Sequence, residues 1–429
     1  MDYLIKGITI VDPFNETSKV GHIYIKDGCI AEIGSIQSVP DAEIIDMKGG
    51  LAIPGLVDMH VHLREPGMES AETIASGTRA AAMGGITDIA CMPNTTPPID
   101  SPSTLKLVQA LVARDGLVRV HPIATITKGR AGKELSEIGD LVTHGAVAIS
   151  DDGSAVMNGD LIRRALEYSK MFSIPVIEHC EDVNLAGTGV VHEGYYSTLT
   201  GLKGIPAAAE EVIVARDIIL AAYTGGHIHL AHISTAGSVE LVRWAKERGI
   251  NVTCEVTAHH LALTDKEITS FDTRYKMNPP LRSEYDREAL IVGLADGTID
   301  CIVTDHAPHS RAHKEVEFNR APFGIIGLET LLPVVLEELV DHQLLDIMDI
   351  IRKVTVNPAR ILGIERTGLN EGEPANLTLI DITNRGIINE ADLVSRSSNS
   401  PWLGKPMRGF PKMTIVNGTV VMQNRKLLF

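Results

Sequence analysis

Two histidines stand two residues apart in the stretch DMHVHLREPG, which covers residues 58–67. Side chains two apart on a β-strand point to the same side, with Cα atoms about 6.5 to 7 Å apart, so His60 and His62 can converge on one cation. Taken alone, such a pair fits two hydrogen-bonded core histidines better than a metal site. Its meaning depends on what the rest of the chain places beside it.

Four more imidazoles or carboxylates follow short apolar runs later in the chain. They are Asp152 in SDDG, His179 in EHCED, His232 in AHIST and Asp305 in TDHAPH. Both side-chain types are ligands that suit zinc. Six ligands exceed the four of one tetrahedral zinc, so the set predicts two ions about 3.5 to 4 Å apart that share a carboxylate. The residues alone leave Asp151 and Asp152 nearly equivalent as that bridge.

Such a zinc pair predicts a hydrolase. It lowers the pKa of bound water from about 15.7 toward about 7 and polarises a carbonyl, which favours hydrolysis of an amide-like bond. The other histidines carry less signal. His227 and His229 are expected to be structural, and His259 and His260 are expected to support a ligand or a loop.

Eight apolar runs that end in polar residues must position these side chains. Beginning at residue 51, they are LAIPGLVDMHVH, ITDIACMPN, VRVHPIATIT, AVAISDD, IPVIEHCED, HIHLAHIST, INVTCEVTAHH and DCIVTDHAPH. Ala-, Leu- and Glu-rich segments with helical spacing separate them, and several end at a glycine that is typical of a helix C-cap. Eight strand–helix units predict the α/β class and a (β/α)8 TIM barrel, whose active site lies at the C-terminal ends of the strands.

The two ends of the chain follow a different pattern of short strands and turns. Residues 1–52 and 366–429 therefore predict a small β domain made from both termini, with the barrel over 53–365 inserted between them. Two separate β appendages are the alternative.

Composition limits the classes of function. The 429 residues carry a formal charge of −16, which disfavours nucleic acid and anionic lipid as partners. No apolar run is long enough to span a bilayer, and the N-terminal stretch lacks the pattern of a signal peptide. Five cysteines without CxxC spacing are typical of reduced thiols, so we expect a cytoplasmic protein.

Taken together, the motifs resemble the class I dihydroorotases of the bacterial type, within the amidohydrolase superfamily. The resemblance rests on GLVDMHVHLREPG, CMPNTTP, ISDDG, EHCED, AHISTAGS, CEVTAHH, MNPPLR, VTDHAPH, APFGIIGLET and VNPARILG. It implies a zinc enzyme of de novo pyrimidine (UMP) synthesis that interconverts N-carbamoyl-L-aspartate and (S)-dihydroorotate plus water.

The resemblance also implies a role for each candidate ligand. One zinc would be held by His60, His62 and Asp305, the other by His179 and His232, and Asp152 would bridge them. Many relatives bridge with a carboxylated lysine, but AISDDG contains none, so the sequence follows the aspartate-bridged subgroup. A single zinc with a weakly occupied second site is the alternative.

The substrate carries a carboxylate, so its pocket needs cationic and amide donors. Arg64 has a planar fork that matches a carboxylate, and Asn94 and His309 are expected to complete the grip. The resemblance adds further contacts, so that the predicted substrate-binding set is His62, Arg64, Asn94, Asn278, His309 and the backbone of Phe323 and Gly324. Residues 310–320 are expected to form either a lid or a plain solvated loop.

Asp305 is the predicted catalytic residue, accepting the proton of the attacking water and passing it to the leaving nitrogen. The rival enzymes are a hydantoinase, a dihydropyrimidinase or an allantoinase, against which the missing lysine and the presence of Arg64 and Asn94 argue. An inactive dihydroorotase-like subunit that scaffolds aspartate transcarbamoylase is a rival of another class, and it would be expected to lose ligands. The resemblance further implies a homodimer and an association with aspartate transcarbamoylase.

Overall fold

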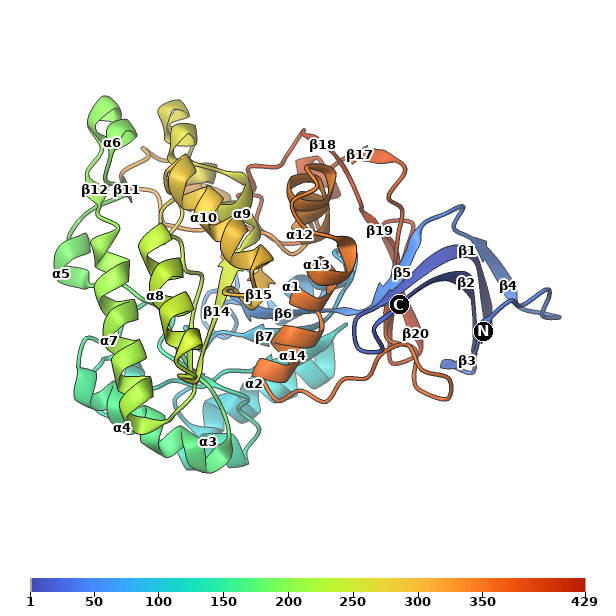
Figure 1. Cartoon of the computed structure of the whole chain (residues 1–429), viewed down its shortest axis with the longest axis horizontal. Coiled ribbons are helices and arrows are strands. Elements are labelled where there is room, and N and C mark those ends of the chain that lie inside the picture. Colours follow the sequence, from blue (N-terminus) through green and yellow to red (C-terminus); the bar gives the residue numbers. More distant parts are fainter. Residues whose placement is uncertain (1, 429) are drawn as a thin grey trace.

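Eight parallel strands form the centre of the larger part of the protein in the computed structural model, which describes residues 2–428. They pair in the orders β6-β7-β8 and β9-β10-β13-β14-β15, and single parallel bridges from Ala124 to Ile149 and from Val61 to His306 join the two sheets at both edges. Figure 1 shows these strands surrounded by helices. The predicted α/β class is therefore confirmed. The strands are β6 (Leu56–Val61), β7 (Ile86–Cys91), β8 (Arg119–Pro122), β9 (Ile149–Ser150), β10 (Val176–Glu178), β13 (Ile228–Leu230), β14 (Val252–Thr257) and β15 (Cys301–Val303).

Helices connect successive parallel strands, and their ends follow from local sequence. At the start of α2, for example, the Ser101 hydroxyl accepts the Thr104 N–H and a proline takes the first helical position. Among residues 2–428, none of the helices combines the length and the apolar character that a membrane span requires. The helices are α1 (Ile74–Met83), α2 (Pro102–Asp115), α3 (Ile138–Thr143), α4 (Gly159–Ser169), α5 (Val183–Ala186), α6 (Tyr195–Thr200), α7 (Ala208–Thr224), α8 (Ala236–Glu247), α9 (Ala258–Ala262), α10 (Glu284–Ala295), α11 (Arg311–Lys314), α12 (Leu331–Val335), α13 (Ile347–Lys353) and α14 (Val356–Ile361).

Shorter elements complete the connections. They are the parallel pair β11 (Val191–His192) and β12 (Gly204–Ile205), the 3₁₀-helices η1 (Lys128–Arg130), η2 (Lys170–Phe172), η3 (Asp265–Ser270), η4 (Thr273–Tyr275) and η6 (Glu390–Asp392), and the π-helix η5 (Leu336–Asp341).

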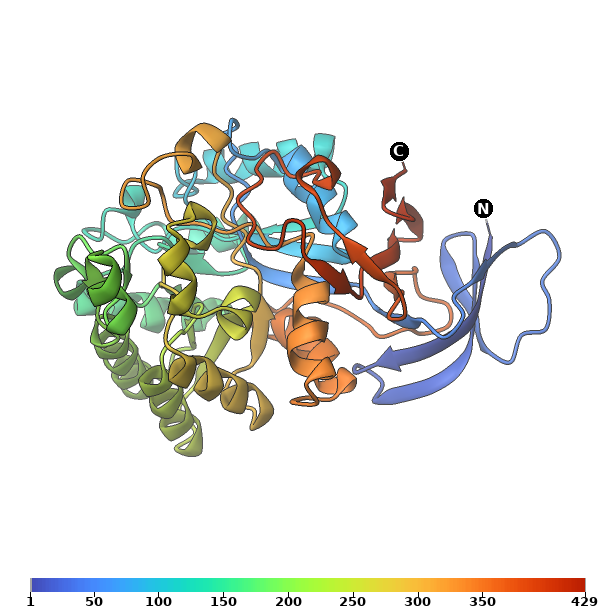
Figure 2. The same cartoon turned by 90° about the horizontal axis from the view of Figure 1, so that it is seen from above.

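The two termini build one nine-stranded sheet. Strand β5 lies between β1, with which it pairs in parallel, and β16, with which it pairs antiparallel. This sheet has its own apolar core, which includes Ile5, Ile23, Leu377 and Ile415. Figure 2 shows the blue N-terminal strands projecting away from the helices. The strands are β1 (Tyr3–Asp12), β2 (Thr17–Lys26), β3 (Cys29–Gly34), β4 (Glu43–Asp46), β5 (Leu51–Pro54), β16 (Leu377–Ile380), β19 (Pro411–Val416), β20 (Thr419–Gln423) and β21 (Lys426–Leu427).

The run LAIPGLVDMHVH differs from the single strand that its pattern predicts. Its first part is β5 of the terminal sheet and its second part is β6 of the parallel strands, with Gly55 between them. A Cβ on Gly55 would lie 2.3 Å from the side chain of Thr87, so only glycine fits where the chain passes from one sheet to the other. The predicted border between residues 52 and 53 therefore falls inside β5.

Residues 385–408 also differ from the expected terminal β domain. Strands β17 (Arg385–Ile387) and β18 (Pro406–Arg408) pair with each other and stay outside the nine-stranded sheet. Between them, the Asn399 amide donates to the carbonyls of Ala307 and Gly324 at 3.0 Å each. This segment thus packs beside the residues that follow β15.

Candidate metal centre

The six predicted ligands lie at the carboxyl ends of five parallel strands, and all six are buried. Carboxyl ends of parallel strands arranged in a ring face one common region, so residues far apart in the chain meet there. The strand–ligand pairs are β6 with His60 and His62, β9 with Asp152, β10 with His179, β13 with His232 and β15 with Asp305.

The ligand atoms converge on the carboxylate of Asp152. Its Oδ1 lies 3.4 Å from Nε2 of His60, 3.4 Å from Nε2 of His232 and 3.7 Å from Nδ1 of His179. Its Oδ2 lies 3.4 Å from Nε2 of His62. Asp152 therefore stands between the histidine pair of β6 and the pair contributed by β10 and β13.

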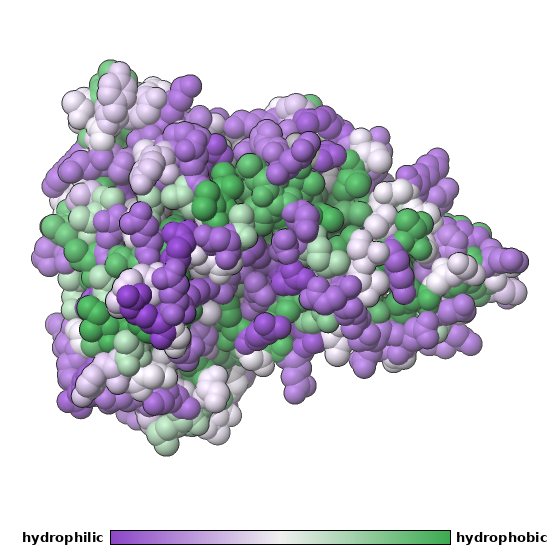
Figure 3. All heavy atoms as spheres, in the orientation of Figure 1, coloured by the Kyte–Doolittle hydropathy of each residue, from purple (hydrophilic) through white to green (hydrophobic). Residues whose placement is uncertain are grey.

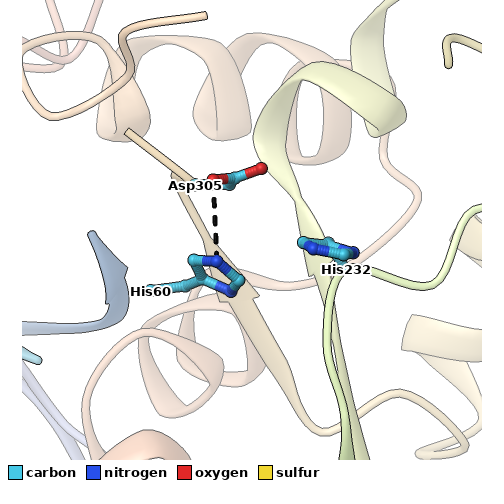
Figure 4. Close-up of side chains that lie close together, drawn as sticks. All are labelled: His60, His232 and Asp305. Carbon is cyan, nitrogen blue, oxygen red and sulfur yellow. Dashed lines mark ion pairs between the residues drawn. The ribbon is translucent and has the colours of Figure 1, made fainter. Parts of the chain in front are cut away.

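Asp305 lies on the β6 side of the cluster. Its Oδ1 is 3.0 Å from Nε2 of His62 and 3.6 Å from Nε2 of His60, and Figure 4 shows its carboxylate above His60 and close to His232. Three overlapping triplets among the described residues bring their ligand atoms within 4.8 Å of one another. They are His60 with His232 and Asp305, His60 with His62 and Asp152, and Asp152 with His179 and His232.

The structure separates the two aspartates of SDDG. Asp151 turns away from the histidines, where its Oδ1 accepts the N–H groups of Ile126 and Thr127 at 2.9 and 3.0 Å and its Oδ2 accepts the Thr127 hydroxyl. Arg130 donates to the carbonyl oxygens of Asp151 and Asp152 at 3.1 and 2.5 Å. Asp151 thus holds the loop, and Asp152 faces the cluster.

Three of the predicted site residues other than glycine have left-handed backbone conformations. The φ angles are +33° at His232, +42° at Asp305 and +63° at Arg64. Such conformations cost residues with a Cβ on the order of 1 to 3 kcal/mol each and persist where the surroundings impose them. At His232 the N–H donates to Glu255 at 3.3 Å, which helps to impose the turn.

The electrostatics of the cluster fit a bound cation. Burial lowers the pKa of His60, but the charges of Asp152, Glu255 and Asp305 outweigh burial and raise it well above its ordinary value. Burial raises the pKa of Asp152, but the charge of His60 and the nearby imidazoles of His179 and His232 hold it well below its ordinary value. Three carboxylates buried around one imidazole therefore strongly favour positive charge at this position.

The pattern of unsatisfied atoms points the same way. Nε2 of His60, Oδ1 of Asp152 and Nδ1 of His232 are buried without a hydrogen-bond partner among the described residues. A buried polar atom without a partner costs about 1 to 3 kcal/mol. Nε2 of His60 and Oδ1 of Asp152 face each other at 3.4 Å. The residues present therefore fit a metal ion bound between these two atoms.

Glu255 supports a ligand and was not among the sequence-predicted residues. Its Oε1 accepts from Nδ1 of His60 at 2.5 Å, and its Oε2 lies 3.2 Å from Nε2 of His229. His229 and His227 in turn each lie 2.8 Å from the Thr253 hydroxyl, which fits the structural role predicted for them. The available signal was a lone carboxylate in the apolar run CEVTAHH.

Glu181 was also missed, although it lies two residues beyond His179 in EHCED. Its Oε2 accepts from Nε2 of His179 at 3.1 Å and from the Asn278 amide at 2.7 Å. The carboxylate therefore links a predicted metal ligand to a predicted substrate contact. Nδ1 of His179 remains the atom that faces Asp152.

The residues predicted to hold a carboxylate lie beside the cluster. Asn94 Oδ1 lies 2.8 Å from Nδ1 of His62, and the buried Arg64 donates through Nε to the Pro308 carbonyl at 3.2 Å. Burial lowers the pKa of Arg64 to about 10, which leaves its guanidinium charged at neutral pH. Burial and the charge of Arg64 lower the pKa of His309 to about 3, so this imidazole is neutral.

The backbone groups of Phe323 and Gly324 have partners inside the protein. The Phe323 carbonyl accepts from Nε2 of His309 at 2.7 Å, and the Gly324 N–H donates to the Lys276 carbonyl at 2.9 Å. A substrate contact through the Gly324 N–H therefore requires this hydrogen bond to be exchanged.

The remaining histidine pair follows the sequence expectation in part. His260 lies 2.7 Å from the Thr257 hydroxyl and 3.1 Å from the Pro279 carbonyl, so it supports the loop. His259 is buried, and burial together with the charge of His260 lowers its pKa well below the ordinary value. Its Nε2 has no hydrogen-bond partner within residues 2–428.

Comparison with known proteins places this geometry in a family. Residues 49–238 match the family model described as dihydro-orotase-like. The dihydroorotase of Pelotomaculum thermopropionicum is 52% identical over 425 residues, covering 99% of both chains, and that of Acetivibrio thermocellus is 50% identical over 425 residues, covering 99% of this chain and 100% of the relative.

Solved structures give the fold alone. The L-hydantoinase (dihydropyrimidinase) from Arthrobacter aurescens superimposes with a TM-score of 0.88 at 24% identity, covering 100% of this chain and 97% of that one. The dihydropyrimidinase from Brevibacillus agri gives 0.85 at 21% identity, covering 100% and 96%. Because its full-length relatives at about half identity are dihydroorotases, the chain belongs to the dihydroorotase family.

Proposed function

We propose that the protein interconverts N-carbamoyl-L-aspartate and (S)-dihydroorotate plus water, the reaction of the family to which it belongs, in pyrimidine synthesis. The observation that carries this proposal is the convergence of His60, His62, His179, His232 and Asp305 on Asp152, in a chain 52% identical to a dihydroorotase over its full length. The substrate is a small molecule.

We propose zinc as the metal, with two ions per chain. His60, His62 and Asp305 would hold one, His179 and His232 the other, and the position of Asp152 between the two sets supports its role as the bridge. Bound zinc would supply a Lewis acid and would lower the pKa of a bound water toward about 7. One zinc with a weakly occupied second site remains the alternative, and metal analysis distinguishes them.

We propose that Asp305 moves the proton. Burial raises its pKa, but the charge of His60 and the hydrogen bond with His62 outweigh burial and keep its pKa below the ordinary value. The carboxylate is therefore ionised at neutral pH and can accept the proton of the attacking water. In hydrolysis it then gives that proton to the leaving ring nitrogen, and in ring closure it works in the opposite order.

We propose that Arg64, Asn94 and His309 hold the substrate carboxylate. The charged, buried guanidinium of Arg64 provides the attraction. The neutral His309 has one ring N–H, which the Phe323 carbonyl accepts at 2.7 Å, so His309 donates to the carboxylate only after that hydrogen bond is exchanged. His62 is in hydrogen-bond contact with Asn94, which ties this grip to the metal cluster.

The dihydropyrimidine ring would meet Asn278 and the backbone of Phe323 and Gly324. The link from Asn278 through Glu181 to His179 supports this arrangement, because it fixes the amide relative to a metal ligand.

The rival hydantoinase-type activities receive support from the fold alone, at 21 to 24% identity. The aspartate in the bridging position and the full-length relatives favour dihydroorotase. An inactive scaffold is disfavoured because all six ligand side chains are present, buried and mutually close.

A direct test combines zinc analysis of the purified chain with spectrophotometric assays on dihydroorotate, hydantoin and allantoin. We expect bound zinc and turnover of dihydroorotate only. Turnover of hydantoin or allantoin without dihydroorotate would reject the proposed substrate, and zinc-free, inactive protein would favour the scaffold.

We also infer the architecture and assembly. The continuous pairing around eight strands supports a closed (β/α)8 barrel that begins after Gly55, with β5 and the other terminal strands in a second unit. We propose a cytoplasmic homodimer able to associate with aspartate transcarbamoylase. The five cysteines are free thiols, which supports the cytoplasmic location. Figure 3 shows hydrophobic residues gathered around α12 on one face, which supports an association surface there. Light scattering of the chain alone and mixed with the transcarbamoylase tests both associations.

A further inference from the structure

Two lysines are buried beside the predicted substrate pocket. Lys276 is 2% exposed and Lys314 is 5% exposed. Lysine is almost never fully buried unless its charge is paired. Yet within residues 2–428 neither ammonium forms an ion pair with a carboxylate, since their polar contacts go to backbone carbonyls.

Lys276 reaches from the segment after η4 into the loop beyond β15. Its Nζ donates to the carbonyls of Phe318 and Asn319 at 2.8 and 3.1 Å. The ammonium also lies 4.9 Å from the ring centroid of Phe323 and 5.6 Å from that of Phe318, within range of cation–π attraction.

Lys314, at the end of α11, completes a second set of contacts. Its Nζ donates to the carbonyls of Pro322 and Gly324 at 3.0 Å each and lies 3.5 Å from the Lys276 carbonyl. Its own carbonyl accepts the Thr273 hydroxyl at 2.6 Å. Lys276 thus fastens the middle of residues 314–324 to the segment after η4. Lys314 ties Pro322 and Gly324 to its own end of the loop, and the Thr273 hydroxyl joins that end to η4.

We propose that Lys276 and Lys314 are positioning residues that clasp residues 310–324 against residues 273–278 and so hold Phe323, Gly324 and His309 ready for the substrate. This inference deepens the proposed function and rests on it. It also makes the loop after β15 a lid with a defined fastening, because opening must release several hydrogen bonds to backbone carbonyls at once.

The charges in this region give the clasp a pH dependence with a definite sign. The charges of Lys276 and Asp272 shift the pKa of Lys314, and the charge of Lys314 in turn lowers the pKa of His309. Burial lowers the pKa of Lys276 to about 8, and burial together with the charge of Lys276 lowers that of Lys314 to about 7.

In an open, solvated loop both lysines would titrate near the ordinary lysine pKa of about 10.4. The closed loop therefore binds fewer protons than the open loop between about pH 7 and 10, so closure is favoured as pH rises through this window. Opening takes up protons and becomes easier as pH falls toward 7. A neutral amine still donates a hydrogen bond, so deprotonation does not remove the carbonyl contacts.

The experiment compares zinc-loaded full-length protein with Lys276→Met and Lys314→Met, in which a flexible apolar chain replaces the ammonium. Lys266→Met, at an exposed lysine of η3, is the matched control. Hydrogen exchange of residues 310–324 and the steady-state constants for dihydroorotate are measured, together with zinc content.

We expect Lys276→Met and Lys314→Met, the two clasp variants, each to increase the hydrogen exchange of residues 310–324 and the KM by about tenfold. This factor is the equilibrium equivalent of one or two lost hydrogen bonds. The kcat should change by less than about twofold. Zinc content and the Lys266→Met control should match the wild type. In the wild type, exchange corrected for its intrinsic pH dependence should rise as pH falls from 9 to 7, and this dependence should be reduced in each clasp variant.

Unchanged exchange and KM in both clasp variants would overturn the inference, as would wild-type exchange that does not depend on pH. If one variant fails to fold, the other variant and the pH dependence of the wild type still test the inference. Hydrogen exchange needs no turnover, so absence of dihydroorotase activity in the wild type would reject the proposed function separately from the clasp.

Discussion

Nδ1 of His60 and Oε1 of Glu255 lie 2.5 Å apart in a fully buried position. This hydrogen bond places the proton of a neutral His60 on Nδ1, so that Nε2 carries the lone pair toward Asp152 and Asp305. A carboxylate behind a histidine also raises the basicity of the ligand. Glu255 therefore prepares His60 to bind a cation.

Replacement of Glu255 by Gln should weaken zinc binding by about 10- to 100-fold, the usual effect of losing a carboxylate that supports a ligand histidine. Titration against a chelating zinc indicator measures this change. Glu247→Gln, at an exposed position on α8, is the control and should bind zinc like the wild type. Equal affinities in both variants would mean that Glu255 has only a packing role.

Replacement of Asp305 by Asn should lower kcat by about 10²- to 10⁴-fold, because the amide cannot accept the proton that the carboxylate takes. Much of the zinc should stay bound, since the other five ligands are intact. Rates and zinc content are measured on the same preparation. A rate within a few fold of the wild type would refute the proton-transfer role.

The two neighbouring aspartates provide a matched pair. Asp152→Asn should lose zinc, because the bridge between the two histidine sets loses its charge. Asp151→Asn should keep zinc but unfold at lower temperature, because it weakens the contacts to Ile126 and Thr127. Metal analysis and thermal unfolding of the metal-free chains measure the difference, and the opposite outcome would reassign the bridge to Asp151.

Zinc binding should release protons. Burial lowers the pKa of His179, but the hydrogen bonds and charges of Asp152 and Glu181 outweigh it and raise the pKa to about 10 in the metal-free protein. His179 is thus protonated at pH 7 and must lose its proton to become a ligand, so zinc affinity should rise with pH up to about 10. Calorimetry in buffers of different ionisation enthalpy counts the protons, and a count of zero would contradict this protonation state.

The residues alone were sufficient to predict five of the six converging side chains, because residue type and position after an apolar run can both be read from the sequence. They were insufficient to choose between Asp151 and Asp152, since that choice depends on which way the chain turns after β9. Glu255 and Glu181 act through partners on other strands, which a linear pattern does not reveal.

The lysine clasp and the segment around Asn399 were hidden for a related reason. Lysines are usually solvent-exposed, so nothing in the spacing of Lys276 and Lys314 indicated burial. Residues 385–408 have the short-strand pattern of the terminal sheet, yet Asn399 packs against Ala307 and Gly324. In both cases tertiary contacts decided the outcome.

The position of β5 between β1 and β16 has a consequence for synthesis of the chain. As the protein leaves the ribosome, β1 to β5 emerge first, and one edge of β5 has no neighbour until all eight parallel strands have been translated. An unpaired edge strand invites association with other chains. Nascent protein is therefore exposed to aggregation from the time β5 emerges until residues 377–380 arrive to cover that edge.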